Sequence, residues 1–263
     1  MSLLRDLCRE GVYRMLYAYT GQGLGLRAAL LYHSVGGKGV RSVGAEAFER
    51  QMELLAMRFS VVRLRDLAKA MTTTPPDANL VCVTFDDGYR DNYEVAVPVL
   101  ERFGIKATFF IATGFLGGTF RTRTGEGPMM TADQIRKLAA AGHEIGAHTV
   151  THPKLTKMPE ATVREEIERA KGDLENLLGS PISSFAYPNG AYDRGVRELV
   201  RLASFRQAAT VREGLIDGES DWLALPRVWV SGKLSLKGFE ARLSPATTWY
   251  RRLRQSKELN PAY

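Results

Sequence analysis

The feature that most constrains this chain is a repeated alternation of short apolar segments with amphipathic helical segments. Eight runs rich in β-branched and apolar residues recur along the sequence, and helical patterns such as 45–58, 91–103 and 159–178 lie between them. This alternation is typical of parallel β/α architecture. The apolar runs span 28–32, 60–64, 80–85, 107–111, 144–147, 184–186, 207–210 and 225–230.

The boundaries of the helical segments carry recognisable signals. Thr131 and Gln134 have the spacing of a capping box, which predicts a helix over 131–141. Gly104, Gly142 and Gly179 follow helical patterns where a left-handed residue commonly ends a helix. We therefore predict an N-terminal amphipathic helix and linker over 1–25, one barrel domain over 26–244, and a basic, weakly patterned surface tail over 245–263.

Seven or eight strand–helix pairs in a chain of 263 residues predict an α/β fold of the TIM-like barrel type. In such barrels the reacting groups lie at the carboxyl ends of the strands. Polar residues follow four of the predicted strands at that end: His33, the pair Asp86 and Asp87, His148, and the turn 187–190. The sequence thus predicts one cluster of polar side chains at one end of the barrel.

His148 and His152 form an i, i+4 pair, a spacing that would bring two imidazoles to one side of a helical turn. Such a pair suits a divalent transition metal, with a carboxylate as third ligand and water in the open position. The alternative is two unconnected surface histidines. The position of His148 directly after a predicted strand favours the metal site.

Asp86 and Asp87 directly follow the apolar run 80–85. Two carboxylates after so apolar a strand are costly to bury unless a metal or hydrogen bonds stabilise them. Neighbouring side chains diverge, so one aspartate can bind a metal while the other faces a substrate. The alternative is a turn whose aspartates cap the following helix, and this accounts for one of the two.

The sequence here resembles the polysaccharide deacetylase family, the NodB-homology carbohydrate esterases. Residues 84–88 match its T-F-D-D-G motif, residues 148–152 match its H-[ST]-x-x-H motif, and the resemblance extends over about 28–230. It implies a distorted, incomplete (β/α) barrel. It also implies one divalent metal ion, Zn²⁺, held by Asp87, His148 and His152, with Asp86 as the catalytic base.

Two departures from the family pattern point to a general acid near the start of the chain. The third family motif normally contains an arginine, which is missing from 185–190, and no histidine follows His152 to supply the usual late acid. Instead, Tyr32 and His33 resemble the early Tyr-His pair of the poly-N-acetylglucosamine deacetylase branch, in which the order of motifs is permuted. That resemblance implies His33 as the general acid.

Other residues receive roles by their position relative to these motifs. Arg227 can replace the missing arginine and orient Asp86, although a salt bridge at the barrel rim is an equal alternative. Tyr187 and the backbone near Asn189 are candidates for an oxyanion or substrate contact. His143 precedes its strand, at the opposite end of the barrel, and receives no role.

The net charge of +7 is concentrated at the two ends of the chain, because residues 1–41 and 242–263 each carry +4 and the middle about −1. A neutral centre argues against a nucleic-acid enzyme. The basic ends fit contact with an anionic membrane, or solvated charge that aids solubility. Charges at 5, 6, 9 and 10 interrupt any signal-peptide core, so we expect a cytoplasmic protein, with peripheral binding at the inner membrane face.

Together these features predict a metal-dependent carbohydrate N-deacetylase acting on an oligosaccharide, a polysaccharide or a lipid-linked saccharide. Three alternatives stay open. One is an amide hydrolase of the same fold acting on a formylated sugar or a small cyclic amide. The second is an O-acetyl esterase, and the third is a saccharide-binding barrel without catalytic activity.

Overall fold

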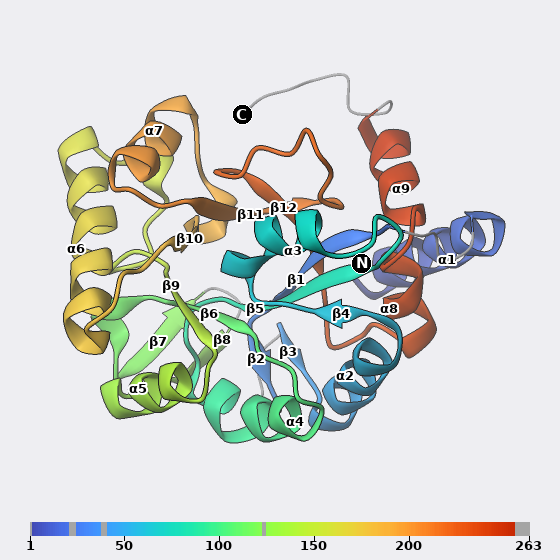
Figure 1. Cartoon of the computed structure of the whole chain (residues 1–263), viewed down its shortest axis with the longest axis horizontal. Helices are drawn as coiled ribbons and strands as arrows, with labels where there is room; N and C mark the ends of the chain where they lie inside the picture. The colour runs from blue at the N-terminus through green and yellow to red at the C-terminus, as the bar shows by residue number, and fades with distance from the viewer. Residues whose placement is uncertain (1, 21–24, 38–40, 123–124, 256–263) are drawn as a thin grey trace.

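The computed structural model describes residues 2–20, 25–37, 41–122 and 125–255, without the side chains of 2–9, 20, 122, 125 and 251–255 (Figure 1). Within these residues, seven parallel strands close into a barrel in the order β1, β12, β11, β10, β9, β6, β5, with β5 pairing back onto β1. The predicted α/β barrel is confirmed, and every predicted run contains a strand. The barrel strands are β1 Arg27–Tyr32, β5 Leu80–Phe85, β6 Thr108–Ile111, β9 Glu144–Ala147, β10 Ser184–Ala186, β11 Gln207–Glu213 and β12 Leu225–Trp229.

The barrel is distorted where a further strand enters beside β5. Strand β4, Ser60–Val61, pairs with the first two residues of β5, while β6 pairs with the last two. Because β4 and β6 use the same edge of β5 at different heights, the strands spread apart at the end where they begin. The pairing of β11 with β12 is also irregular, because its register shifts between Ala209 and Glu213.

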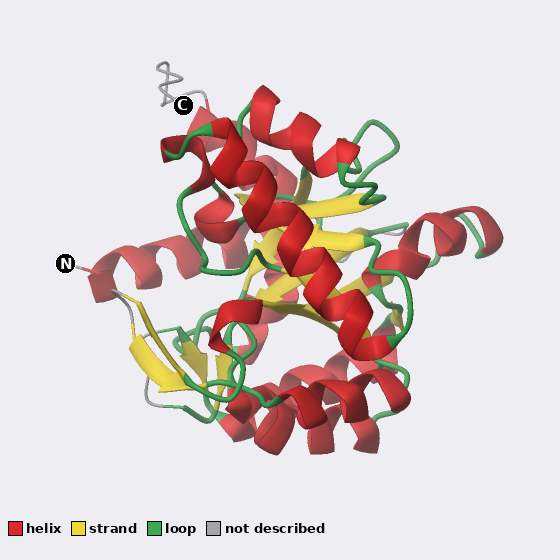
Figure 2. Ribbon diagram, turned by 90° about the vertical axis from the view of Figure 1, so that its left-hand side faces the viewer, coloured by secondary structure: helices red, strands yellow, loops and turns green. Residues whose placement is uncertain are grey.

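Helices cover the outside of the strands (Figure 2). The capping box predicted at Thr131 and Gln134 is confirmed, and Asp193 caps the helix that follows β10. Gly104, Gly142 and Gly179 have the left-handed backbone expected after helices. The helices that follow the strands are α2 Ala45–Arg58, α3 Leu67–Thr73, α4 Val97–Arg102, α5 Ala132–Ala140, α6 Glu160–Leu178 and α7 Arg194–Leu202.

Two layers of apolar side chains result from the alternation of side chains along the strands. One cluster fills the barrel interior and the other lies between the strands and the helices. The interior cluster includes Ala29, Cys82, Phe110, Ala186, Ala209 and Leu225. The outer cluster includes Leu30, Val81, Val83, Phe85 and Phe109.

Several elements were not predicted from the sequence. The hairpin β7–β8, Thr119–Thr122 and Gly125–Pro128, follows β6, and the short strands β2, Ser34–Val35, and β3, Ser42–Val43, pair after β1. The helix predicted over 91–103 begins as a π-helix, η2 Asn92–Ala96, before α4 continues it. These additions lie after strands, so they extend the loops at the carboxyl end of the barrel.

The two ends of the chain pack together. Helix α1, Ser2–Thr20, confirms the predicted N-terminal helix, and it contacts α8, Leu236–Arg242, and α9, Ala246–Gln255 (Figure 1). The described part of the predicted tail contains helix α9, in which Ala246 and Thr247 are buried and Trp249 is half exposed. Tyr13 stacks on Tyr250 at 4.5 Å between ring centroids, so apolar packing holds α9 against α1. Residues 256–263 lie outside the described residues, and the three-part domain division stays a prediction.

Candidate active site and metal centre

The first of the two adjacent aspartates lies inside the barrel against an arginine from β12. Side chains alternate along β5, and Cys82 faces the barrel interior. Asp86 lies on the same side of the chain as Cys82 and therefore also faces inward. Arg227 Nη1 and Nη2 donate to its two carboxylate oxygens, both at 2.7 Å. The Arg227 side chain is fully buried, so this ion pair is internal and not a surface bridge on the rim. Burial alone would raise the pKa of Asp86, but the Arg227 guanidinium brings it below its ordinary value.

Asp87 faces a different direction because its backbone is left-handed, with φ of 74°. Gly88 follows with φ of 91°, and a Cβ there would lie 3.1 Å from Ile111 Cδ1, so glycine allows this turn. The Asp87 side chain is only 5% exposed. Burial alone would raise its pKa, but the neighbouring His148 and His33 bring it well below the ordinary value.

His148 directly follows β9 and points one ring nitrogen at Asp87. Its Nδ1 donates to the carbonyl oxygen of Ala186 at 2.7 Å. This hydrogen bond leaves Nε2 as the ring atom that can bind a metal ion. Nε2 lies 3.4 Å from Asp87 Oδ1, and although burial lowers the pKa of His148, the hydrogen bond to Asp87 and the charge of Asp86 raise it above its ordinary value.

His152 reaches the same carboxylate by a loop, and not by a helical turn as the i, i+4 spacing suggested. Thr149 and His152 both have left-handed backbones, with φ of 64° and 56°, so the chain doubles back between the two histidines. His152 Nε2 lies 3.3 Å from Asp87 Oδ1. Burial, followed by the nearby His148, lowers the pKa of His152 to about 4. Its imidazole is therefore neutral near pH 7 and able to bind a cation.

The loop between the two histidines is held by a carboxylate that no sequence motif singled out. Glu166, buried on α6, accepts hydrogen bonds from the backbone N–H groups of Val150 and Thr151 and from the Thr151 hydroxyl, at 2.6–2.9 Å. The Thr149 hydroxyl accepts from the backbone N–H of His152 at 3.0 Å. A left-handed backbone costs free energy in a residue other than glycine, and these hydrogen bonds offset that cost in this loop.

The three predicted ligands fit a divalent metal ion. One ligand atom each from Asp87, His148 and His152 lies within 4.8 Å of the others. Two ligands of a tetrahedral zinc ion, each at about 2.0–2.1 Å, are separated by roughly 3.3 Å. The distances of 3.3 and 3.4 Å from Asp87 Oδ1 to the two imidazole nitrogens agree with that separation.

His33 lies close to this centre, as its position after β1 predicts. It is 6% exposed, and burial lowers its pKa although Asp87 and Asp86 act in the opposite direction. Arg41, which was not predicted as a site residue, donates from Nη1 to His33 Nε2 at 3.1 Å. The Arg41 guanidinium also lies over the Trp229 ring at 5.3 Å. The free protein therefore holds His33 as a neutral imidazole.

The turn after β10 carries the other two predicted contact residues. The Tyr187 hydroxyl donates to the Leu223 carbonyl at 2.8 Å, and its backbone N–H donates to Ala209, so both donors already have partners. Asn189 is exposed and left-handed, with φ of 56°. Among the described residues, four of the five non-glycine residues with positive φ belong to the loops that follow β5, β9 and β10.

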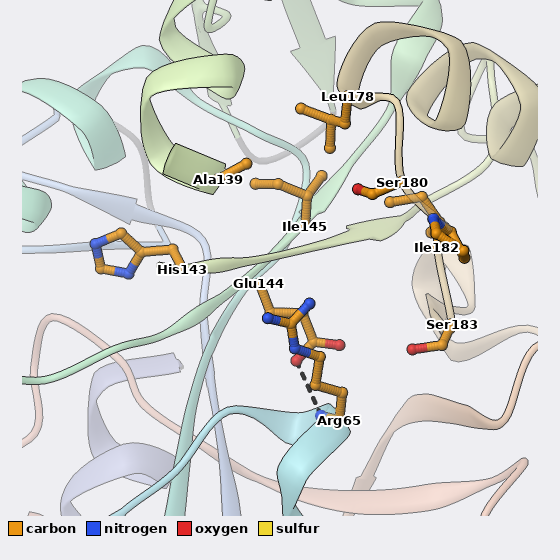
Figure 3. A pocket seen from close by; sticks show the side chains of 10 residues that line it. Arg65, Ala139, His143, Glu144, Ile145, Leu178, Ser180, Ile182 and Ser183 are labelled. Atoms are coloured by element: carbon orange, nitrogen blue, oxygen red, sulfur yellow. Dashed lines mark hydrogen bonds between the residues drawn. The ribbon is translucent and has the colours of Figure 1, made fainter. Parts of the chain in front are cut away.

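His143 lies at the other end of β9, as expected. It lines a pocket with Arg65, Glu144 and Ser183, and Figure 3 shows its imidazole pointing away from the other labelled side chains. Its Nδ1 accepts from the backbone N–H of Ala107 at 3.1 Å. The structure therefore separates this histidine from the three that surround Asp86 and Asp87.

The sequence profile named polysaccharide deacetylase matches residues 73–208, just over half of the chain. The chain belongs to the polysaccharide deacetylase family. The matched segment contains Asp86, Asp87, His148 and His152, which are the adjacent carboxylates and the two imidazoles. His33 and Arg227 lie outside it, so the profile does not bear on those two residues.

This polysaccharide deacetylase family member is similar to several proteins in sequence and to solved structures in fold. The protein YxkH of Bacillus subtilis is 27% identical over 214 residues, which cover 81% of this chain and 74% of YxkH. A poly-β-1,6-N-acetyl-D-glucosamine N-deacetylase of Staphylococcus aureus is 24% identical over 57% of this chain and 54% of its own length. The solved structure of IcaB from Ammonifex degensii superposes with a TM-score of 0.73 at 27% identity, covering 84% and 98% of the two chains.

Proposed function

We propose that this family member is a metal-dependent hydrolase that removes an N-acetyl group from an amino sugar in an oligosaccharide, a polysaccharide or a lipid-linked saccharide. The observation that carries the proposal is the separation of two neighbouring carboxylates into two environments. Asp86 is paired with the buried Arg227, while Asp87 faces two imidazoles. A protein that only binds saccharides has no need for both arrangements.

In this proposal Asp87, His148 and His152 hold one divalent ion, and we propose Zn²⁺. One carboxylate oxygen and two imidazole nitrogens form a donor set that catalytic zinc sites use, with coordination positions left for water and substrate. When bound, the ion supplies a Lewis acid that polarises the acyl carbonyl and lowers the pKa of a water molecule. The low pKa of Asp87 and the neutral His152 leave these side chains ready to coordinate near pH 7.

Asp86 is the proposed general base. It takes a proton from the attacking water as the water oxygen bonds to the acyl carbon. Arg227 acts on Asp86 as a positioning residue, because its two N–H groups hold the carboxylate in one orientation and keep it ionised. A missing partner would leave either charge buried and unpaired, which is strongly destabilising.

His33 is the proposed general acid. As the C–N bond breaks, it gives a proton to the departing nitrogen, and the products are acetate and a free amino sugar. Since burial lowers the pKa of His33 in the free protein, the proposal requires the imidazole to be protonated once substrate is bound. The turn containing Tyr187 and Asn189 is the proposed oxyanion contact, through the Asn189 backbone, because the donors of Tyr187 already have partners.

Product analysis tests the reaction. We expect N-acetylated glucosamine oligosaccharides to yield equal amounts of acetate and free amine with zinc-loaded protein. On matched O-acetylated and N-formylated saccharides, faster release of acetate without free amine would instead identify an O-acetyl esterase, and faster release of formate would identify a deformylase. Protein stripped of metal by a chelator should be inactive and regain activity when zinc is added. Full activity of the stripped protein would contradict the proposed mechanism.

We also propose that the packed chain ends contact an anionic membrane surface. The sequence segments 1–41 and 242–263 each carry a charge of +4, and α1 and α9 pack together. Exposed apolar side chains lie on these helices: Met15 is 65%, Tyr19 87% and Trp249 47% exposed. Within the described residues, no helix combines the length and hydropathy needed to cross a bilayer. Failure of the protein to co-sediment with anionic vesicles at low salt would contradict this contact.

A further inference from the structure

The two histidines of the proposed metal centre are held in different ways. His148 is fixed by the hydrogen bond from its Nδ1 to the Ala186 carbonyl. Within the described residues, the His152 ring has no comparable hydrogen bond through Nδ1. It instead packs against Phe120, with 5.2 Å between the ring centroids and 69° between the planes. The orientation of one histidine thus depends on a hydrogen bond and that of the other on an aromatic contact.

Phe120 belongs to the hairpin β7–β8 and is 5% exposed. It forms a small apolar cluster with Tyr89 and Met129, and Phe115 packs on it at 4.4 Å between ring centroids. These neighbours leave the Phe120 ring little freedom to turn, because buried aromatic rings with neighbours on several sides keep one rotamer. A fixed ring can in turn restrain the imidazole that packs on it.

The same hairpin is attached to the turn that carries Asp87. The Met130 backbone N–H donates to Gly88 O at 3.0 Å, and Gly117 N–H donates to Met130 O at 2.9 Å. Tyr89 and Met129 form an isolated antiparallel bridge. A Cβ added at Gly127 would lie 3.2 Å from the Tyr89 ring, so glycine allows this ring to lie close to β8. The hairpin therefore connects the Asp87 turn with the His152 loop.

We propose that Phe120 is a positioning residue for metal binding: it holds the His152 imidazole with Nε2 directed at the ion that Asp87 and His148 also bind. The inference rests on the metal centre of the proposed function. Residues that orient metal ligands typically change metal affinity about 10- to 100-fold when they are removed. A packing contact should lie at the lower end of that range.

The experiment measures zinc affinity of the full chain by competition with a chromophoric chelator, without substrate. We expect Phe120→Ala to weaken zinc binding about 10-fold. Phe120→Tyr keeps the ring and should bind like the original protein, while Phe120→Leu should lie between them. The matched control is Phe205→Ala, which removes a buried ring that packs on Phe185 outside this cluster and should change affinity less than 3-fold.

Two further measurements separate orientation from folding. The visible absorption of the cobalt-substituted protein reports ligand geometry, and Phe120→Ala should alter it while Phe205→Ala should not. If Phe120→Ala does not fold, Gly127→Val tests the same contact by displacing Tyr89, and it should also weaken zinc binding. Thermal unfolding of the metal-free variants verifies that each is folded.

The outcomes are distinct. Equal zinc affinity for folded Phe120→Ala and the original protein would overturn the role of Phe120 and leave the proposed function intact. An original protein that binds no zinc or cobalt would overturn the metal centre, and the role of Phe120 with it. Weakened binding in Phe120→Ala without any deacetylation by the original protein would support Phe120 and contradict the proposed reaction.

Discussion

The two ends of the barrel both contain buried ionisable groups, but these groups face different surroundings. At the amino end, both carboxylate oxygens of Glu144 accept hydrogen bonds, from Ser184, from Thr108 and from the backbone of Arg65. At the carboxyl end, Asp87 faces the Nε2 atoms of two imidazoles, and the three ligand atoms surround a common point. The carboxylate oxygens of Glu144 already have donors, whereas in the proposed function a cation completes the second arrangement.

This difference separates structural from functional buried charge. A buried carboxylate with all its donors in place stabilises the fold and has no capacity left for a ligand. Left-handed backbone also gathers at the carboxyl end, at Asp87, Thr149, His152 and Asn189. Such strain persists where surrounding contacts enforce it, commonly at functional sites. Replacing carboxylates by amides at each end tests this distinction.

The largest effect should come from Asp87→Asn. Asparagine has the same shape and tolerates the left-handed backbone, so the fold should remain. The lost charge should weaken zinc binding at least about 100-fold and reduce deacetylation to background, since ligand and charge are removed together. Isothermal titration with zinc and an acetate-release assay would measure both. Near-normal zinc affinity would show that Asp87 is not a ligand.

Asp86→Asn should have the next largest effect, with a different signature. Turnover should fall about 1,000-fold, as expected on removing a general base, while zinc affinity should stay within a few-fold of the original. The variant should also be less stable, because Arg227 then carries an unpaired buried charge. Steady-state kinetics and zinc titration on the same preparation separate the two aspartates. Parallel loss of zinc affinity and turnover would contradict their division of roles.

The residues at the two ends of the barrel could largely be predicted from the sequence, because strand geometry determines which residues lie at each end. Strands buried on both faces read as continuous apolar runs, which is why β5 and β9 were predicted with their correct ends. Residues that directly follow parallel strands share one end of the barrel. Asp86, Asp87 and His148 were therefore predicted to lie together, and the structure brings them together with His33 and His152.

The missed features depend on tertiary contacts that leave little local signal. The positive φ values of Thr149 and His152 are enforced by contacts such as the hydrogen bonds of the loop to Glu166, sixteen residues from Val150. Arg41 donates to the His33 imidazole, and Phe120 packs on the His152 imidazole, so each contact joins two different segments of the chain. Helix α9 forms against Tyr13 of α1, a contact across almost the whole chain. Periodicity reports which face of an element is buried and does not report the partner.

A smaller effect should appear in the pH dependence of stability, from the amino end. Burial lowers the pKa of His143 to about 4. As pH falls below about 6.5 the unfolded chain takes up a proton that the folded chain does not accept until about pH 4, so stability falls through this interval. The asparagine side chain in His143→Asn can still accept from the Ala107 N–H but does not titrate. On going from pH 7 to pH 4, the variant should therefore lose about 2–3 kcal/mol less stability than the original protein. Urea denaturation at pH 7 and pH 4 gives the difference, and an unchanged pH dependence would contradict the assignment.

The smallest effect is expected for Glu144→Gln, the amide substitution at the amino end that matches Asp87→Asn at the other. If the glutamine oxygen accepts from the Arg65 N–H and the Thr108 hydroxyl, its NH₂ group faces the Ser184 hydroxyl, which then loses its acceptor. In the other orientation the NH₂ group meets the Arg65 N–H. One unsatisfied buried group costs about 1–3 kcal/mol, so the unfolding free energy should fall by about that amount.

Zinc affinity and turnover of Glu144→Gln should stay within about two-fold, because the amino end holds none of the proposed ligands. Chemical denaturation and the acetate-release assay measure the two quantities. A loss of turnover comparable to that of Asp87→Asn would show that the two ends are coupled, and the separation of structural from functional charge would then be wrong.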